Sequence, residues 1–433
     1  MSFPVPPKAE LWALVDCNAF YCSCERLFRP DLKDKPVAVL SNNDGCLVAL
    51  SPETKALGFK GGQPYFQQAL KLKQSGVAVF SSNYSLYGDI SRRVMTCLES
   101  VVPDVGQYSI DEAFIPLAGS AAADPLAVGW ELCRRVMTWV GMPVRVGIGP
   151  TRTIAKLASH WAKKMGRVFR LEADSGEYGD ILAQTQVSDV WGIGRGLSEK
   201  LNKTGIFSAL ELSRLRPAAA KKLLTVRGLK TVLELNGTQA IDGDFTPVHP
   251  KSFVSSRSFG RKVETIEPLS EALAGHAASI GAKLRAAETV AAVVSVFIGT
   301  AHYADRPFQT GATVLVPEAT DYTPRLMEAV RKALKSCFRP GFKYARAGVM
   351  AFDLRPKTGP EEISLSGPPT DRNPAPNRPD SLMAALDRIN HRYGRETVRF
   401  SAQGQPEADW RMKREKLSEI STTDWGGLPR VRV

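Results

Sequence analysis

The chain has 433 residues with 57 Lys or Arg against 44 Asp or Glu, a formal net charge of +13 and a pI near 9.4. This excess favours a polyanionic partner, with nucleic acid as the leading candidate, although a basic chain can also simply be basic. The length predicts two to four domains. No apolar run approaches the roughly 20 residues that cross a bilayer, and the start lacks the features of a signal peptide, so a cytoplasmic protein is expected.

The cysteines do not follow a pattern typical of disulfides or zinc sites. The chain has seven, at positions 17, 22, 24, 46, 97, 133 and 337, without paired CxxC spacing. This odd, scattered set predicts free thiols in a reducing compartment.

Strands and helices alternate through about residue 170. Residues 11–15 (LWALV) are an apolar run that ends at Asp16 and predicts a buried strand followed by a helix. Strands are expected next at 36–42 and 77–82 with a glycine-punctuated helical stretch between them, then a helix at 94–102, a hairpin at 105–117, a helix at 130–140, a strand at 144–149 and a helix at 153–164. The alternation indicates a sheet with helices packed on it.

The rest of the chain divides into three parts. Short helices broken by glycines occupy 180–240, and strand-like runs with two helical segments between them fill 251–356. Residues 356–380 are rich in Pro, Gly, Asn and Asp, as in a linker, and a helix at 381–394 precedes a basic tail. We therefore expect a multidomain α+β protein.

Two adjacent carboxylates, Asp111 and Glu112, lie in the otherwise apolar stretch QYSIDEAFIPL. Burying an isolated carboxylate costs several kcal/mol unless it is paired or bound to metal. The two would face opposite sides of a regular strand, but a turn or bulge can bring them together. If Asp16 lies on the neighbouring strand, three carboxylates meet at one sheet edge, which suits Mg²⁺ and two-metal phosphoryl transfer.

The residues alone leave another interpretation open. Asp is a favoured helix N-cap, so Asp16 could cap the following helix while Asp111 and Glu112 form an exposed turn.

A resemblance that covers about residues 11–425 decides between them. The segments ALVDCNAFYCSCERLFRPDLKDKPVAVLSNNDGC, FSSNYSLYGDISRRV, YSIDEAF, VGIGPTRTIAKLASHWAKK, VWGIGRGLSEKL, SSRSFGR and WRMKREKLSEISTTDW occur in the family's order. Together they resemble the UmuC-type branch of the Y-family translesion DNA polymerases. The resemblance implies a right-hand fold with a palm (9–20 and 81–171), fingers (21–80), a thumb with a helix-hairpin-helix (172–243), a little finger (251–356), and a linker with a C-terminal extension (357–433).

The resemblance also implies the roles of the active-site residues. Two Mg²⁺ ions are expected at Asp16, Asp111 and Glu112, with the carbonyl of Cys17 as a further ligand. Tyr21, five residues after the first Asp, matches the steric gate that excludes a 2′-hydroxyl. On helical spacing alone, Tyr21 would be a core aromatic.

Two lysines match positions that bind the triphosphate. Lys163 matches the family's phosphate-binding lysine, although a solvated helix face explains Lys156 and Lys163 equally well from spacing. Lys55 falls where relatives outside this branch carry an arginine, and a lysine lacks the bidentate geometry of arginine. Many UmuC-type chains also carry an arginine where this chain has Leu50.

Four further residues are expected to contact DNA. Gly192 and Gly194 of WGIGRG resemble the helix-hairpin-helix turn, where backbone N–H groups approach a phosphate. Arg257 and Arg261 of SSRSFGR match phosphate contacts of the little finger. The linker has EEISLSGPP where UmuC-type chains commonly carry a sliding-clamp motif, so clamp binding through it is not expected.

The implied function is error-prone, DNA-templated DNA synthesis past damaged bases in the SOS response. Primer-template DNA, dNTPs, a UmuD′ dimer and a RecA filament are the implied partners, with nucleoid association during activity. A non-catalytic polymerase-like adaptor is the main alternative, but such relatives lose the acidic triad. A nucleotide cyclase would have no need of the thumb-like hairpin or the basic little finger.

Overall fold

The computed structural model describes residues 10–241, 250–301, 303–357, 378–394, 396–405, 408 and 410–419. The chain divides into two units, one formed by Met1–Thr246 with Glu415–Val433 and the other by Pro247–Arg414. Within the described residues, no helix is both long and apolar enough to cross a bilayer.

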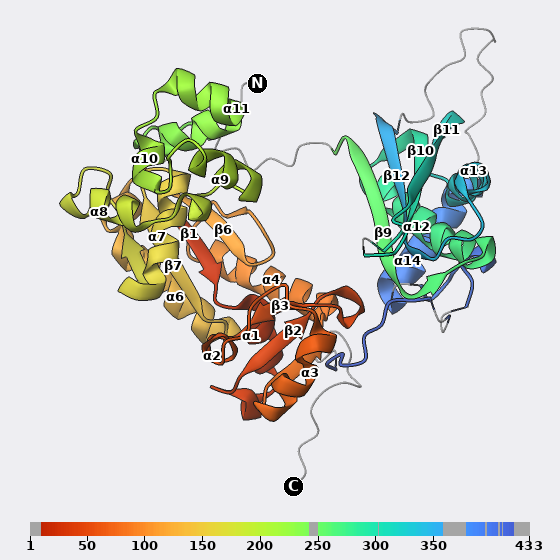
Figure 1. Cartoon of the computed structure of the whole chain (residues 1–433), viewed down its shortest axis with the longest axis horizontal. Coiled ribbons are helices and arrows are strands. Elements are labelled where there is room, and N and C mark those ends of the chain that lie inside the picture. The colour runs from red at the N-terminus through yellow and green to blue at the C-terminus, as the bar shows by residue number, and fades with distance from the viewer. Residues whose placement is uncertain are drawn as a thin grey trace, which may run out of the picture. The chain divides into compact units, whose positions relative to one another are not determined.

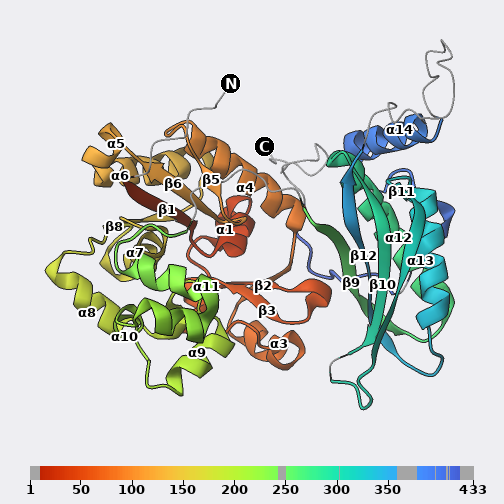
Figure 2. The same cartoon turned by 90° about the horizontal axis from the view of Figure 1, so that it is seen from above.

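The first unit contains a five-stranded sheet in the order β5-β6-β1-β7-β8 (Figures 1 and 2). The central strand β1 is antiparallel to β6 and β7, and β8 is parallel to β7. The strands are β1 (Leu11–Cys17), β5 (Gly106–Gln107), β6 (Glu112–Leu117), β7 (Val144–Gly149) and β8 (Val168–Arg170). The strands expected at 11–15 and 144–149 and the hairpin expected at 105–117 are therefore present.

Each face of this sheet is covered by helices. Helices α4 (Tyr84–Glu99) and α6 (Pro125–Val140) share the main apolar core with one face, and α7 (Arg152–Met165) crosses the other. A Cβ added to Gly147 on β7 would lie 2.0 Å from the backbone N of Ser159 and 2.3 Å from the carbonyl of Ala155. Glycine at this position therefore lets α7 lie directly on the sheet.

A smaller, three-stranded sheet has the order β3-β2-β4. Its strands are β2 (Val37–Leu40), β3 (Leu47–Leu50) and β4 (Ala78–Ser81), and its neighbouring helices are α1 (Phe20–Leu27), α2 (Pro52–Ala56) and α3 (Tyr65–Gln74). The sequence interpretation missed β3, because it assigned only helix between the two flanking strands. Leu50, at the end of β3, is 4% exposed and packs in the core of this sheet.

A C-terminal segment, Glu415–Ser418, lies along β4. The Ser81 N–H donates to the carbonyl of Lys416 at 2.9 Å, and the Lys416 N–H donates to Ser81 Oγ at 3.0 Å. The Asn83 side-chain amide donates to the carbonyl and hydroxyl oxygens of Ser418 at 3.3 and 3.1 Å. These contacts attach the segment to the edge of the three-stranded sheet.

Helices complete the first unit; most are short, as the sequence predicts, but the last is 19 residues long with a non-helical break at Thr225. They are α8 (Gly176–Gln184), α9 (Arg195–Asn202), α10 (Ala209–Ser213) and α11 (Pro217–Leu235), and they share a core with the apolar face of α7. Leu157 and Trp161 are members of that core.

The second unit is a four-stranded antiparallel sheet in the order β11-β10-β12-β9, with two helices packed on it. Its elements are β9 (Ser252–Val263), α12 (Ile266–Ala286), β10 (Thr289–Thr300), β11 (Gln309–Thr320), α13 (Thr323–Cys337) and β12 (Tyr344–Pro356). Both helical segments expected between the strands are present.

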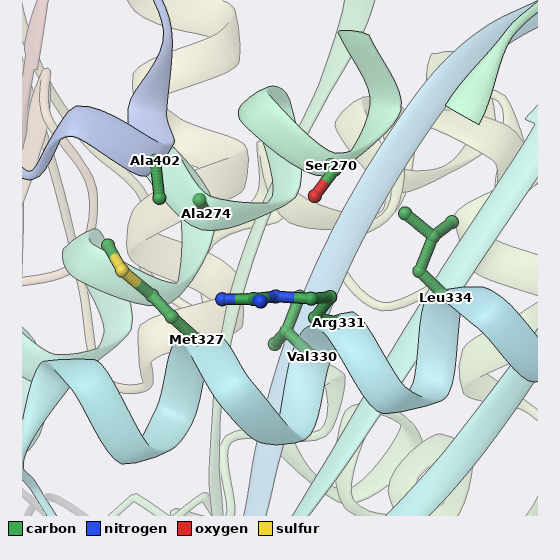
Figure 3. A pocket seen from close by; sticks show the side chains of 7 residues that line it. All are labelled: Ser270, Ala274, Met327, Val330, Arg331, Leu334 and Ala402. Carbon is green, nitrogen blue, oxygen red and sulfur yellow. The ribbon is translucent and has the colours of Figure 1, made fainter. Parts of the chain in front are cut away.

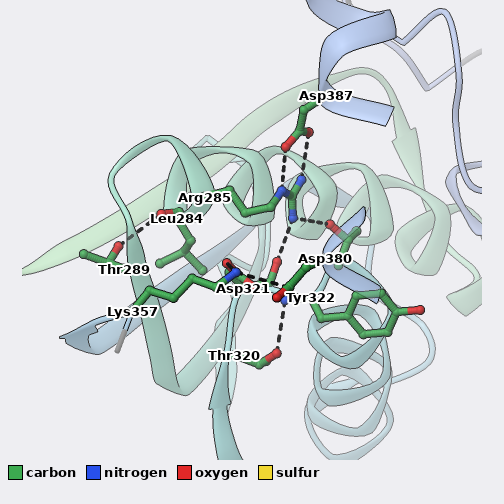
Figure 4. Close-up of polar contacts among 10 residues, drawn as sticks. Leu284, Arg285, Thr289, Thr320, Asp321, Tyr322, Lys357, Asp380 and Asp387 are labelled. Atoms are coloured by element: carbon green, nitrogen blue, oxygen red, sulfur yellow. Dashed lines mark hydrogen bonds and ion pairs between the residues drawn. The ribbon is translucent and has the colours of Figure 1, made fainter. Parts of the chain in front are cut away.

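Helix α14 (Arg378–Tyr393) is held to this unit by ion pairs (Figure 4). Arg285 of α12 donates to both carboxylate oxygens of Asp387 at 2.6 and 2.9 Å. Lys357 contacts Asp380 at 3.2 Å and Asp321 at 2.8 Å. The chain expected as one C-terminal extension thus contributes residues to both units.

A small pocket lies where Ala402 meets α12 and α13 (Figure 3). It holds about 20 Å³, room for a single water. It is lined by Ser270, Ala274, Met327, Val330, Arg331, Leu334 and Ala402. This size fits a packing gap rather than a substrate site.

Candidate active site

Three charged residues face the same side of the larger sheet at the end of its central strand. Asp16 on β1 lies directly opposite Glu112 on β6 and Arg145 on β7. Residues directly opposite in antiparallel strands project from the same face, which here is the face that α7 covers. Asp111 joins them at the sheet end, because the Cys17 N–H donates to its carbonyl at 2.9 Å.

A tight turn places Asp111 beside Glu112 without a regular strand running through both. Residues 109–111 form a bend, and β6 begins at Glu112. The Ser109 hydroxyl contacts Asp111 Oδ1 at 2.6 Å, and the N–H groups of Asp111 and Glu112 donate to Ser109 Oγ at 3.3 and 3.0 Å. The turn expected from the sequence is present, and hydrogen bonds to the Ser109 hydroxyl stabilise it.

Two cations neutralise the carboxylates. Arg145 Nη2 contacts Asp16 Oδ2 at 2.7 Å, and Lys156 Nζ contacts the two oxygens of Glu112 at 2.9 and 3.0 Å. The side chains of Asp16 and Glu112 are each 17% exposed. Burial, together with the charges of Glu112 and Asp111, raises the pKa of Asp16 to about 6 against the opposing effect of Arg145.

This geometry excludes the helix-cap interpretation of Asp16. The N-cap of α1 is Ala19, which has no side-chain cap, and Asp16 is engaged by Arg145 instead. Glu112 is largely buried, so the carboxylate pair is not a fully exposed turn.

The donor set fits a hard divalent cation. The three carboxylates repel one another at Asp16, and carboxylate oxygens are the ligands that Mg²⁺ prefers. In the described part of the chain, no three His, Cys, Asp or Glu side chains are placed close enough to hold an ion. The carboxylates of Asp16 and Glu112 contact Arg145 and Lys156, and that of Asp111 contacts the Ser109 hydroxyl. The three side chains must therefore leave these partners and change rotamer to bind a common ion.

Tyr21 lies in the first turn of α1 and stacks on a buried tyrosine. Its ring centroid is 4.3 Å from that of Tyr87 at an interplanar angle of 15°, and Tyr84 meets it edge-on at 6.2 Å. Tyr87 is fully buried, and its hydroxyl donates to Glu25 at 2.6 Å. Tyr21 itself is only partly buried and packs against the main apolar core.

Lys163 lies in the last turn of α7. Partial burial lowers its pKa, and the charges of Arg145 and Lys55 lower it further, while Asp16 raises it. Lys163 nevertheless remains accessible to solvent, and Lys55 on α2 is exposed. The charges of Arg145 on β7 and Lys55 on α2 therefore both disfavour the protonated form of Lys163.

The expected DNA-contacting residues are distributed over both units. Gly192 has φ +88°, a conformation that favours glycine, and Gly194 is the N-cap of α9. Arg257 and Arg261 are exposed on the edge strand β9. Gly192 and Gly194 belong to the first unit, whereas Arg257 and Arg261 belong to the second. The linker motif at 361–369 lies outside the described residues.

The sequence interpretation did not assign Arg145 or Lys156 to the site. A signal for Arg145 was available, because it interrupts the apolar strand VRVGIG with a charge. Lys156 was placed on a solvated helix face, but the structure pairs it with Glu112 and sets its ammonium 4.6 Å from the ring centre of Tyr108.

Comparisons with known proteins show the family to which the chain belongs. Residues 15–160 match the impB/mucB/samB family, 250–365 match its C-terminal domain, and 380–431 match a domain of unknown function, DUF4113. The chain is 40% identical to Protein UmuC of Salmonella typhimurium strain LT2 over 431 residues, covering 98% of this chain and 100% of that protein. It is 38% identical to Protein ImpB of Salmonella typhimurium with the same coverage.

Solved structures share the fold. A Y-family DNA polymerase chimera of Dbh and Dpo4 matches with a TM-score of 0.62 at 17% identity, covering 80% of this chain and 99% of that chain. An insertion ternary complex of Dbh DNA polymerase matches with a TM-score of 0.53 at the same identity and coverage. From the family matches and the full-length identity to UmuC, the chain belongs to the impB/mucB/samB family, the UmuC-type branch of the Y-family DNA polymerases.

Proposed function

We propose that this DNA-directed DNA polymerase extends a primer past damaged bases by two-metal phosphoryl transfer at Asp16, Asp111 and Glu112. The observation that supports this most is the register that sets Asp16 opposite Glu112, with Asp111 at the adjoining turn. When bound, two Mg²⁺ ions supply charge neutralisation at the attacking and leaving oxygens. The carbonyl of Cys17, at the end of the same strand, is the proposed additional ligand.

The surrounding residues position the substrates. Lys163 and Lys55 bind the triphosphate, because both are cations accessible to solvent and the charges of Asp16 and Lys55 both act on Lys163. The partly buried ring of Tyr21 lies under the sugar and excludes a 2′-hydroxyl. Gly192 and Gly194 present backbone N–H groups to a DNA phosphate, and Arg257 and Arg261 neutralise others.

The biological setting is proposed from family membership. It comprises SOS mutagenesis on nucleoid DNA, with a UmuD′ dimer and a RecA filament as activating partners. Primer extension on damaged and undamaged templates, with and without UmuD′ and RecA-ATP, tests this setting. Activity that neither partner alters would contradict their activating role.

The chemistry is tested by primer extension with Asp111→Ala. We expect the rate to fall at least about 100-fold, the scale of losing one group that stabilises transition-state charge. Asp180→Ala, an exposed carboxylate on α8, is the control and should extend normally. Undiminished extension by Asp111→Ala would overturn the assignment. If the wild-type protein binds primer-template but does not extend it, the adaptor alternative is favoured.

A further inference from the structure

Arg145 lies at the proposed metal site but has no role in the chemistry proposed above. It lies opposite Asp16 in the β1–β7 register, contacts Asp16 Oδ2 at 2.7 Å and donates to Asn18 Oδ1 at 2.8 Å. Its side chain is 15% exposed. Its buried Nε has no hydrogen-bond partner among the described residues, so one donor of the guanidinium remains unsatisfied.

A permanent Arg145–Asp16 pair conflicts with divalent-ion binding at Asp16. The ion and the guanidinium are like charges that compete for the same carboxylate. When Asp16 turns to a divalent ion, Arg145 loses its main counter-charge and remains largely buried. A buried cation requires another anion.

The neighbourhood indicates which anion replaces Asp16. Arg145 and Lys55 both act electrostatically on Lys163, as does Asp16, so these three cations belong to one electrostatic neighbourhood with Asp16. A ligand with several negative charges fits three cations. The planar guanidinium fork matches phosphate oxygens, with which it forms short, charge-assisted hydrogen bonds.

We propose that Arg145 is a further nucleotide-binding residue that exchanges partners. It neutralises Asp16 when no nucleotide is bound, and it binds a phosphate oxygen of the incoming nucleoside triphosphate when divalent ions take the carboxylate. This inference rests on the metal-binding role proposed for Asp16. Ion binding and nucleotide binding are thereby coupled at one side chain.

The test compares Arg145→Gln and Arg145→Lys in two measurements. The first is Mn²⁺ binding to the protein without DNA or nucleotide, followed by electron paramagnetic resonance of free Mn²⁺. The Gln variant should bind Mn²⁺ several-fold more tightly, because the competing charge is gone. The Lys variant, which keeps that charge, should bind it like the wild type.

The second measurement is the KM for dNTP in primer extension. Both variants should raise KM at least about 10-fold, the cost of losing a charge-assisted or bidentate hydrogen bond, with a smaller change in kcat. The control is Arg170→Gln on β8 of the same sheet, where Arg170 pairs with Glu172 at 2.8 Å. It should change neither quantity.

The outcomes separate this inference from the proposed function. Tighter Mn²⁺ binding with an unchanged KM would overturn the phosphate role of Arg145, and unchanged Mn²⁺ binding in the Gln variant would overturn its competition for Asp16. The variant Asp16→Asn tests separately whether Asp16 binds the metal ion. If Asp16→Asn leaves Mn²⁺ binding unchanged, the metal role of Asp16 fails whatever Arg145 does.

Discussion

Single residues at this site are held by partners that are distant in sequence. Lys156 and Lys163 lie two turns apart on α7 and share a helix face, as their spacing predicts. Lys156 nevertheless pairs with Glu112, 44 residues earlier, whereas Lys163 is exposed. Spacing specifies the face of a helix but not the charge that a long-range fold brings to it, so the pairing of Lys156 with Glu112 could not be predicted from the sequence.

Tyr21 owes its orientation to the tyrosine beneath it. The parallel stack on Tyr87, which is fixed by burial and by Glu25, holds the ring in one position. If Tyr21 is the steric gate that we propose, its replacement with Ala should open the space under the sugar and raise ribonucleotide incorporation relative to deoxynucleotide incorporation.

This prediction is measured as the ratio of kcat/KM for rNTP and dNTP. We expect the ratio to rise by at least about 10-fold, because removing a steric clash is worth upward of 1.4 kcal/mol. Tyr84→Phe, which keeps the edge-on ring, is the control and should discriminate as the wild type does. An unchanged ratio in Tyr21→Ala would remove its role as a gate.

At the scale of elements, the close seating of α7 on β7 sets the site. Lys156 and Lys163 project from α7, and Arg145 projects from β7, so their separation depends on how near the helix lies. Gly147 permits that approach. Strand β7, helix α7 and the hairpin that contains β6 were each predictable from local patterns. The close contact between α7 and β7 was not, because it depends on the absence of a side chain at Gly147.

Gly147→Ala should displace α7 and destabilise the first unit. Its Cβ would overlap backbone atoms of Ser159 and Ala155, which cannot rotate away, so we expect a loss of about 3 kcal/mol or more in the free energy of unfolding. Denaturant unfolding measures the loss. Gly179→Ala within α8, where an added Cβ meets nothing within 4 Å, should be neutral or slightly stabilising. Equal stability of both variants would contradict the close-packing argument.

At the scale of the whole molecule, the C-terminal part of the chain contributes to both units. Residues 378–414 belong to the second unit, with α14 fixed by Arg285, and the chain from Glu415 onward belongs to the first. The sequence predicted the helix and the basic tail but treated 357–433 as one extension. Pairing between Ser81 and Lys416 spans 335 residues, and no local pattern encodes it.

Lys416→Pro should detach the segment Glu415–Ser418 from β4. Proline removes the N–H that donates to Ser81, so local opening becomes easier, and trypsin should cleave after Arg414 about 10-fold faster. Limited proteolysis followed by mass spectrometry measures this. Glu419→Pro, three residues later, is the control, and equal cleavage of the two variants would show that the pairing does not protect the segment.

The same pairing has a consequence for biosynthesis. Lys416 emerges from the ribosome 335 residues after Ser81, a delay of roughly 20 to 70 s at ordinary elongation rates. Throughout that time β4 is a sheet edge whose Ser81 N–H lacks its final partner. Open edges invite pairing with other chains, so the nascent protein passes through a period of vulnerability to misassembly that ends only when its last segments are made.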